Sequence, residues 1–277
     1  MKKRIYGFVA VLWAFSFLAA AGAAHAQAAQ GESRASAQQM ADEEVMGLLW
    51  MRRAAEYRAL CYQAYNGALS RVETAVQERE GKHGKPIAVV VDCDETVLDN
   101  TGYFAASVAA GNGVLNGNWW RSHVVGKISP AMPGARDFLD ALHALGAEVF
   151  YVTNRSAAYN YDGTKANLES LGFPNVDDAH LLLLTDTGSK QARFAKIAET
   201  HEIVAYLGDN YGDFPFASGD SSARKTAVDA AKEDWGRRYF MLPNPIYGSW
   251  VTAIAQEYFS MTKEERAAVN RAFLLRD

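Results

Sequence analysis

Hydrophobic residues follow two alternating patterns over most of the chain. Apolar runs cover Ile87 to Val91, Glu148 to Val152, His180 to Leu184 and Ile203 to Leu207. The stretches between them, such as ARDFLDALHALG and SKQARFAKIAET, space their apolar residues at helical intervals. Continuous apolar strands that alternate with helices are typical of a parallel sheet covered on both faces. The pattern therefore predicts an α/β fold.

The part of the chain ahead of the first run has a helical pattern of its own. From about Asp42 to Arg79 apolar residues recur at helical spacing, which predicts one or two long amphipathic helices. A chain of 277 residues, of which 49% are hydrophobic and 22% charged, can bury a full core. We therefore expect one domain over residues 42–277 that includes these helices.

The first 26 residues have the features of a secretory signal peptide. Basic residues at positions 2–4 precede an apolar stretch, and Ala24 and Ala26 mark a cleavage site. We expect cleavage after Ala26, a flexible polar segment over residues 27–41, and export to the periplasm or medium. The alternative is an uncleaved membrane anchor, since the apolar stretch is nearly long enough to span a bilayer.

The net charge limits the kinds of binding partner that we expect. The net charge of -4 shows no basic surplus, so polymeric nucleic acid is not an expected partner, whereas a mononucleotide is compatible.

The two cysteines, Cys61 and Cys93, could form a disulfide in an exported protein. Cys93 alternates with two aspartates and should point into the core. We therefore favour two buried free thiols.

Polar residues follow the predicted strands at their carboxyl ends, where ligands bind in parallel sheets. In chain order they are Asp92, Asp94 and Thr96; Thr153, Asn154 and Arg155; Lys190; and Asp209 and Asp213. Carboxylates that share a site repel one another, so their joint placement favours a bound cation. Ligands that are all oxygen atoms favour Mg²⁺ over zinc.

These motifs resemble those of the haloacid dehalogenase (HAD) superfamily. DCDET matches its DxDxT signature, and Thr153, Lys190 and GDNYGDF fall where its later motifs are expected. From about Met46 to Tyr258 the chain is similar to the class C bacterial acid phosphatases. These are the acid phosphatases and 5′-nucleotidases of the lipoprotein type. The supporting stretches are AEYRALCYQAYNGAL, PGARDFLDAL, VFYVTNR, LGFPNV, KQARFAKI and MLPNPIYGSW. The resemblance implies a Rossmann-like parallel sheet with a helical N-terminal extension and cap elements.

Two features depart from that class. The class commonly carries a lipoprotein cysteine, but no cysteine follows the apolar N-terminal stretch here, so we expect no stable membrane anchor. Cys93 stands where an apolar residue is usual, which leaves the catalytic chemistry unaffected. Relatives commonly dimerise, so a homodimer is possible.

The residue types at the strand ends suit hydrolysis of a phosphate monoester through an aspartyl-phosphate. Asp92, last on its strand, is the predicted nucleophile. Asp94, two residues on, is the predicted general acid and later the base toward water. Thr153 is expected to donate to a phosphoryl oxygen, and Lys190 to supply fixed positive charge.

The same strand ends supply the predicted metal ligands. Asp92 and Asp209 are expected to hold Mg²⁺, together with, by resemblance, the backbone carbonyl of Asp94. Asp213 is expected to orient Lys190 or a metal-bound water.

The substrate is predicted from aromatic residues. Some thirty residues, a size typical of lids and binding elements, separate the first motif from PGARDFL and contain Trp119 and Trp120. LPNPIYGSW adds Tyr247 and Trp250. Resemblance to the class C enzymes, which hydrolyse 5′-nucleotides and other monoesters, favours aromatic clamps on a nucleobase; packing in the core is the alternative. The predicted substrate-binding residues are Trp119, Trp120, Asn154, Arg155 and Tyr247.

Other functions are open at this level. They are a broad-specificity or sugar phosphatase, a phosphotransferase that uses the same intermediate, and a non-catalytic metal-dependent binding or storage protein. A dehalogenase is disfavoured because a departing halide needs no proton, so an acid at the Asp94 position would be superfluous. Replacement of Asp92 or Asp94 would favour the non-catalytic protein, but both are present.

Overall fold

The computed structural model describes residues 45–110, 117–126, 129–216 and 219–275. The predicted signal peptide and the segment over residues 27–41 lie outside the described residues. Cleavage and export therefore stay predictions. Within the described part of the chain, no helix combines the length and the apolar character needed to cross a bilayer.

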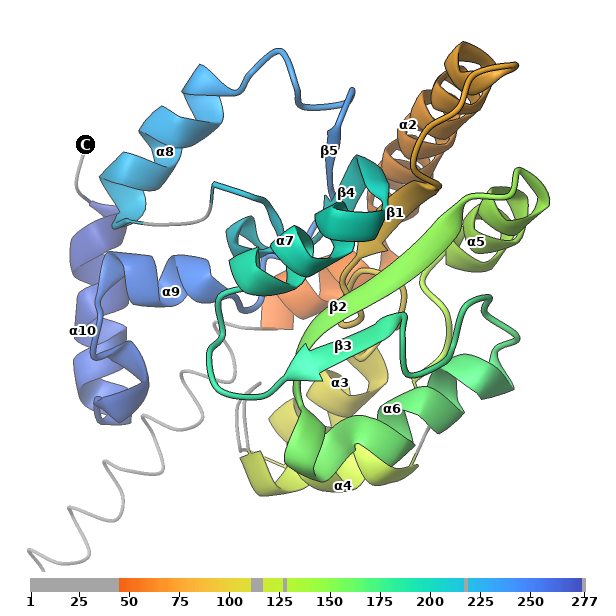
Figure 1. Ribbon diagram of the computed structural model, residues 1–277. Coiled ribbons are helices and arrows are strands. Elements are labelled where there is room, and N and C mark those ends of the chain that lie inside the picture. Colours follow the sequence, from red (N-terminus) through yellow and green to blue (C-terminus); the bar gives the residue numbers. More distant parts are fainter. Residues whose placement is uncertain (1–44, 111–116, 127–128, 217–218, 276–277) are drawn as a thin grey trace, which may run out of the picture.

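A five-stranded parallel sheet forms the centre of the described fold (Figure 1). The strands are β1 (Ile87–Val91), β2 (Glu148–Ser156), β3 (Leu181–Leu184), β4 (Glu202–Gly208) and β5 (Tyr239–Met241). Their order across the sheet is β3-β2-β1-β4-β5, and each neighbouring pair is parallel. The predicted α/β class with a parallel sheet is confirmed. β5 is an addition, and β2 continues to Ser156, so that Thr153, Asn154 and Arg155 belong to the strand itself.

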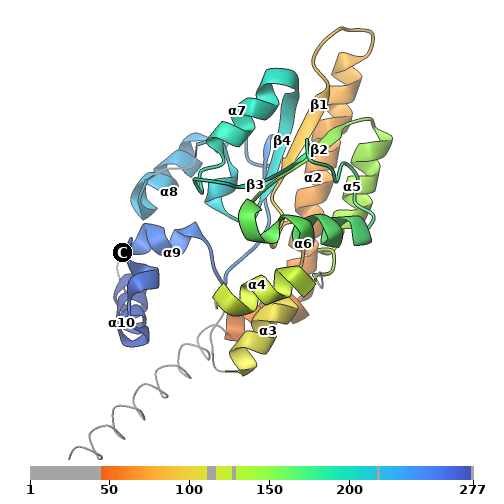
Figure 2. The same ribbon diagram turned by 60° about the horizontal axis from the view of Figure 1, so that its bottom comes forward.

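Helices cover both faces of this sheet, as the unbroken apolar runs require. After residue 54 the described helices are α2 (Ala55–Arg79), α3 (Thr101–Ala109), α4 (Gly117–Gly126), α5 (Ala135–Ala144), α6 (Ala157–Ser170), α7 (Gln191–Thr200), α8 (Ser221–Ala230), α9 (Ser249–Ile254) and α10 (Lys263–Leu274), with 3-10 turns η1 (Tyr211–Asp213) and η2 (Tyr258–Ser260). Figures 1 and 2 show α2 and α5 on one side of the sheet and α7 on the other.

The two faces of β1 enter separate hydrophobic cores. Val89 and Val91 pack into the core that α2 and α5 share, whereas Ala88 and Val90 pack into the core under α7. Fully burying one such valine is worth about 1.5–3 kcal/mol. Because both faces of the strand are buried in this way, β1 is fixed in register, and the residue that follows it has a defined position.

The N-terminal extension consists of two helical segments. Residues 45–53 are helical, the chain is extended at Ala54 (φ −76°, ψ 136°), and α2 follows. The two-helix version of the prediction is therefore confirmed for the described residues. Cys61 on α2 and Cys93 after β1 are both buried in the same core and both free, as the alternation pattern favoured.

The insertion between β1 and α5 supplies α3 and α4. These two helices lie beside one another, and α4 also lies next to α6 (Figure 2). α3 begins at Thr101, shortly after the end of β1, so the insertion is attached directly to the carboxyl edge of the sheet. This placement agrees with the expected cap elements.

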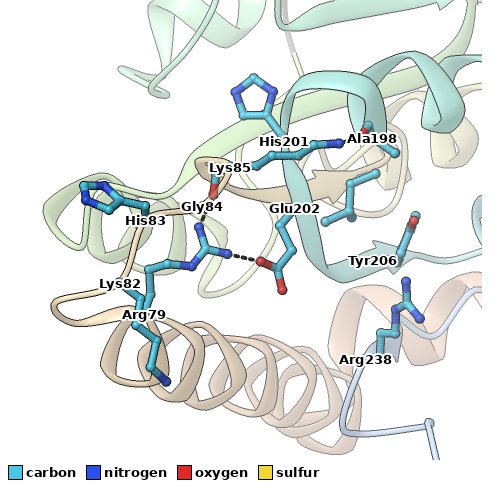
Figure 3. A pocket seen from close by; sticks show the side chains of 11 residues that line it. Arg79, Lys82, His83, Gly84, Lys85, Ala198, His201, Glu202, Tyr206 and Arg238 are labelled. Atoms are coloured by element: carbon cyan, nitrogen blue, oxygen red, sulfur yellow. Dashed lines mark hydrogen bonds and ion pairs between the residues drawn. The ribbon is translucent and has the colours of Figure 1, made fainter.

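A second polar region lies at the opposite, amino edge of the sheet. An open hollow of about 500 Å³ is formed there by the end of α2, the loop that precedes β1, and the starts of β4 and β5 (Figure 3). Its basic residues are Arg79, Lys82, Lys85 and Arg238. In Figure 3 the Arg79 guanidinium is directed at Glu202, with which it forms an ion pair.

Candidate active site

Asp92 follows directly after β1 at the carboxyl edge of the sheet. Its backbone N–H donates to the carbonyl of Leu207 on β4, which fixes the backbone at this point. Lys190 Nζ donates to Asp92 Oδ1 at 2.6 Å and lies 2.6 Å from Asp213 Oδ1. The lysine is only 3% exposed. A single buried ammonium therefore joins the predicted nucleophile to Asp213.

Three carboxylates converge beside this lysine. Asp92, Asp209 and Asp213 each place an oxygen within 4.8 Å of the others. Burial raises the pKa of Asp92 to about 7, although Lys190 acts in the opposite direction. Burial, together with the charges of Asp213 and Asp92, also raises the pKa of Asp209 well above its usual range. A divalent cation would relieve this repulsion, and an all-carboxylate donor set fits a hard cation. The acidic cluster is therefore a fitting site for a divalent metal.

Neighbouring side chains orient Asp209. Asn244 Nδ2 donates to Asp209 Oδ2 at 2.8 Å, and Thr96 Oγ1 donates to Oδ1 at 3.3 Å. The side-chain oxygen of Asn244, Oδ1, accepts in turn from the backbone N–H groups of Ile246 and Tyr247. Asn244 thus ties the fourth strand end to the segment that carries Tyr247.

Asp94 is held by partners outside this cluster. Arg155 Nη2 donates to Asp94 Oδ1 at 2.6 Å, and its Nε lies 3.1 Å from both carboxylate oxygens. Asn100 Nδ2 donates to Oδ1 at 2.9 Å. Arg155 is 3% exposed, so it is a buried partner of Asp94 and not an exposed ligand group. Its place among the substrate-binding residues stays a prediction.

Thr153 and Asn154 lie on the neighbouring strand end. In the β1–β2 register Val91 faces Tyr151, so Thr153 lies close to the level of Asp92. Thr153 is buried, and its Oγ1 accepts from the backbone N–H of Arg155 at 3.1 Å. Asn154 is exposed and donates from Nδ2 to the carbonyl of Gly188 at 2.8 Å. Asn154 therefore links β2 to the loop that leads to Lys190.

An aromatic cluster of Tyr103, Phe104, Trp120 and Tyr247 adjoins Arg155. The rings of Phe104 and Trp120 are nearly parallel, with centroids 6.4 Å apart, and Phe104 lies 5.2 Å from Tyr247. Arg155 Cζ lies 5.5 Å from the centroid of the Trp120 ring. The cluster therefore stands beside the partner of Asp94. The side chain of Trp119 is outside the described part of the structure, and Trp250 is 43% exposed.

The Tyr247 hydroxyl forms a hydrogen bond with a buried acid, Glu95. It donates to the carboxylate of Glu95, which also accepts from the backbone N–H of Asn100 at 2.9 Å. Burial raises the pKa of Glu95 to about 8. Tyr247 is thus half-buried, with a fixed hydroxyl and a ring that packs on Phe104.

Residue patterns did not single out Asn100, which donates to Asp94, or His123 and Ser129, which bond the Asn100 side chain. Asn100 lies inside the first motif stretch, IAVVVDCDETVLDN, and its proximity to Asp94 is the one sequence signal that points to it. His123 and Ser129 come from the insertion and its exit, where no strand or helix period indicates what they contact.

Two solved structures of similar fold are of one bacterial enzyme. The class C acid phosphatase of Bacillus anthracis is 33% identical and superimposes with a TM-score of 0.80, covering 86% of this chain and 98% of that one. Its structure with tungstate bound is 32% identical and gives a TM-score of 0.79 over the same shares.

A plant protein is a more distant relative. Vegetative storage protein 1 of Arabidopsis thaliana is 25% identical over 166 residues, which cover 57% of this chain and 54% of that protein. The chain thus spans about half the length of this curated relative. The family description that matches residues 15–250 is HAD superfamily, subfamily IIIB (acid phosphatase). Since the match includes all the acidic strand ends, the chain belongs to this acid phosphatase family of phosphoric monoester hydrolases, as its motifs predicted.

Proposed function

We propose that this protein is an exported, Mg²⁺-dependent acid phosphatase that hydrolyses phosphate monoesters, 5′-nucleotides in particular, through an aspartyl-phosphate. The observation that carries the proposal is the contact of buried Lys190 with Asp92 and Asp213, beside Asp209. A carboxylate at a strand end, a fixed ammonium and a candidate metal cluster are the parts that phosphoryl transfer requires.

Asp92 performs the first step. One of its carboxylate oxygens attacks phosphorus, the bond to the leaving oxygen breaks, and the phosphoryl group stays on Asp92 as an acyl phosphate. Lys190 keeps a positive charge beside the reacting oxygens. Thr153, on the neighbouring strand, donates to a phosphoryl oxygen in this proposal.

Asp94 moves the proton in both steps. It donates to the leaving oxygen as the ester bond breaks, and it then takes a proton from the water that attacks the acyl phosphate. Asp92 and free phosphate are regenerated. Its pair with Arg155 holds the carboxyl group in place through both transfers.

Asp92 and Asp209 would hold Mg²⁺, together with the backbone carbonyl of Asp94 that the resemblance implies. Neutralisation of phosphoryl charge is the chemistry that the ion supplies when bound. Asn244 and Thr96 keep the Asp209 carboxylate turned to this position. Tungstate, bound in the Bacillus anthracis structure, is a tetrahedral oxyanion like phosphate, which supports an oxyanion site in this chain.

The aromatic cluster is the proposed nucleobase site, with Trp120 and Tyr247 as stacking faces. A stacked base is worth about 1–3 kcal/mol, so Tyr247→Ala should lower kcat/KM for adenosine 5′-monophosphate by roughly five- to a hundredfold. Ribose 5-phosphate, which has no base, should be hydrolysed nearly as before. Tyr247→Phe is the matched control, because it keeps the ring and removes only the hydroxyl that donates to Glu95. An equal loss of kcat/KM on both substrates would indicate that Tyr247 is a core residue and does not bind the base.

The similarity to a vegetative storage protein keeps a non-catalytic storage function as the second candidate. Phosphate release from a panel of monoesters, with Mg²⁺ and with EDTA, separates the two. A phosphatase releases phosphate with Mg²⁺ and stops with EDTA, whereas a storage protein is no more active than its Asp92→Asn variant. Nucleotides, sugar phosphates and aryl phosphates in one panel also distinguish a nucleotidase from a broad-specificity or sugar phosphatase, and an added alcohol acceptor reveals a phosphotransferase.

Export and assembly are proposed from the sequence alone. N-terminal sequencing of the periplasmic or secreted protein should give a chain that begins near Gln27. A chain that begins at Met1 in the membrane fraction would identify the apolar stretch as an anchor. Size-exclusion chromatography with light scattering tests the possible homodimer.

A further inference from the structure

The two oxygens of the Asp94 carboxylate have unequal surroundings. Oδ1 accepts from Arg155 Nη2 at 2.6 Å, from Arg155 Nε at 3.1 Å and from Asn100 Nδ2 at 2.9 Å. Among the described residues, Oδ2 accepts from Arg155 Nε alone, at 3.1 Å. A carboxylate oxygen has two lone pairs, so Oδ1 is saturated while Oδ2 keeps acceptor capacity.

The orientation of the Asn100 amide is fixed by two neighbours. Ser129 Oγ donates to Asn100 Oδ1 at 2.6 Å, and His123 Nε2 lies 3.2 Å from the same oxygen. On the other side, Asn100 Nδ2 donates to Asp94 and to Glu95 Oε2, the latter at 3.3 Å. A flipped amide would set its oxygen against two carboxylates, which are acceptors only when ionised. The nitrogen must therefore face Asp94.

The contacts of Ser129 define the direction of this chain. Its hydroxyl has one hydrogen, which it gives to Asn100, so the His123 Nε2–H donates to Ser129 Oγ at 2.9 Å. Burial lowers the pKa of His123, with a smaller contribution from Arg155, which agrees with a neutral imidazole that carries its proton on Nε2. His123, Ser129 and Asn100 are all buried. The donors thus run in one direction, from His123 to Asp94.

We infer that Asn100, oriented by Ser129 and His123, is a positioning residue for Asp94. It occupies Oδ1 and leaves Oδ2 as the oxygen that exchanges a proton with the leaving group and with water. The inference rests on the acid role proposed above for Asp94. It also gives the insertion a part in the reaction, because His123 lies on α4 and its ring contacts Trp120 and Tyr103.

The dependence of the rate on the leaving group tests the inference. A p-nitrophenolate ion leaves with little protonation, whereas the alkoxide of ribose 5-phosphate needs a proton. Asn100→Ala should therefore lower kcat/KM for ribose 5-phosphate by roughly 10- to 100-fold, part of the roughly 10²–10⁴ that a positioned general acid contributes, and kcat/KM for p-nitrophenyl phosphate by no more than about threefold. The measured quantity is kcat/KM because it covers only the steps up to departure of the leaving group, whereas hydrolysis of the phosphoenzyme is common to both substrates.

Ser129→Ala and Asn167→Ala complete the design. Ser129→Ala removes one hydroxyl with little change in volume and should show the same selectivity for the poor leaving group, with a smaller loss. Asn167 bonds the backbone of Ser129, through Oδ1 at 3.2 Å and Nδ2 at 2.9 Å, and these bonds do not involve Asp94 or Asn100. Asn167→Ala should lower the melting temperature and reduce the rates on both substrates by the same factor.

The Asp94→Asn variant separates the positioning role of Asn100 from the acid role of Asp94. If Asp94→Asn is selective for the poor leaving group while Asn100→Ala and Ser129→Ala are not, the positioning role is refuted and the acid role stands. If Asp94→Asn itself reduces the rates on both substrates equally, the acid role proposed for Asp94 fails. Selectivity in all three variants supports the inference. Selectivity in Asn167→Ala as well would assign the effect to loop disorder and overturn it.

Discussion

The carboxyl and amino edges of the sheet both gather charged side chains, but they arrange them differently. At the carboxyl edge, Asp92, Asp209 and Asp213 lie together with Lys190 as their close buried cation. At the amino edge, Arg79 pairs with Glu202, and Lys85 donates to the carbonyl of Ala198 at 2.6 Å. The carboxyl-edge group thus has three carboxylates for one ammonium, whereas the amino-edge side chains Arg79 and Lys85 each have a partner of their own.

This difference indicates which edge can do chemistry. The amino edge has the hollow of about 500 Å³, but the Glu202 side chain there is 52% exposed, so solvent screens its ion pair with Arg79. The carboxyl edge holds buried carboxylates whose pKa values are raised, and such groups cluster at functional sites. Unbalanced charge in a buried place, and not the size of a hollow, identifies the site.

The largest contrast between the edges is expected from Asp92→Asn. An amide cannot form the phosphoenzyme, so turnover should fall by roughly 10⁴-fold or more. The backbone pairing with Leu207 is unaffected, so circular dichroism and the melting temperature should stay close to those of the unmodified protein. Substantial residual phosphatase activity after purification away from host enzymes would contradict the assignment of the nucleophile.

Metal binding should stabilise the carboxyl edge and leave the amino edge unchanged. A ligand present at 100 times its Kd adds about 2.7 kcal/mol to the free energy of unfolding. Mg²⁺ should therefore raise the melting temperature, EDTA should reverse the shift, and Asp209→Asn should remove most of it. Glu202→Gln at the amino edge is the control and should keep the shift. A Glu202→Gln variant that no longer responds to Mg²⁺ would place the metal elsewhere.

The amino edge should instead respond to pH. Burial alone would lower the pKa of His180, but its hydrogen bonds to Glu148 and Asp177 outweigh burial and raise it above its usual 6.5. Its contribution to stability is therefore full below pH 6.5 and is lost as the pH rises through the raised value. The hydrogen bond from His180 lowers the pKa of Glu148 from its usual 4.5, so the Glu148 contribution is present above pH 4.5 and is lost at lower pH.

The destabilisation caused by His180→Ala should consequently be largest between about pH 4.5 and 6.5 and smaller at pH 8. Its pH-dependent part should not exceed about 1 kcal/mol, because solvent screens the partners. Chemical denaturation of both proteins across this range measures it, with His83→Ala as a control at an exposed histidine. A difference that is flat with pH would show that His180 acts only by packing on Phe150.

The smallest effect is expected from the hollow itself. Replacing Arg79 by Ala removes a partly exposed ion pair with Glu202, which is worth about 0.2–1 kcal/mol. The free energy of unfolding should fall by that amount, and kcat/KM should be unchanged for every monoester in the panel. A loss of activity in this variant would mean that the amino edge takes part in function and that the contrast between the edges is wrong.

The strand ends could be predicted because a parallel sheet aligns them. Once β1 and β4 are recognised as buried runs, Asp92 and Asp209 must lie at the same edge of the sheet, and the structure brings them together. β5 escaped prediction because three residues show no period. The cysteines were assigned correctly because alternation along an extended segment decides which side chains face the core.

The side-chain partners at that edge could not be predicted. Arg155 reaches Asp94 from the neighbouring strand, across 61 residues of sequence, and Tyr247 reaches Glu95 across 152. Such contacts depend on rotamers and on how the loops pack, neither of which leaves a periodic signal. For the same reason the pattern could not indicate that Arg155 forms a buried pair with Asp94.

The two buried cysteines bear on how the chain matures. Burial raises the pKa of Cys61 to about 11 and also raises that of Cys93, so both stay as thiols, and a thiol is a far weaker nucleophile than a thiolate. The folded domain thus needs no oxidant or disulfide isomerase and reaches the same covalent state in a reducing cytoplasm as in an oxidising compartment. Thiol-directed reagents should modify it only while it is unfolded, so the rate at which the two thiols become protected from labelling measures the rate of folding.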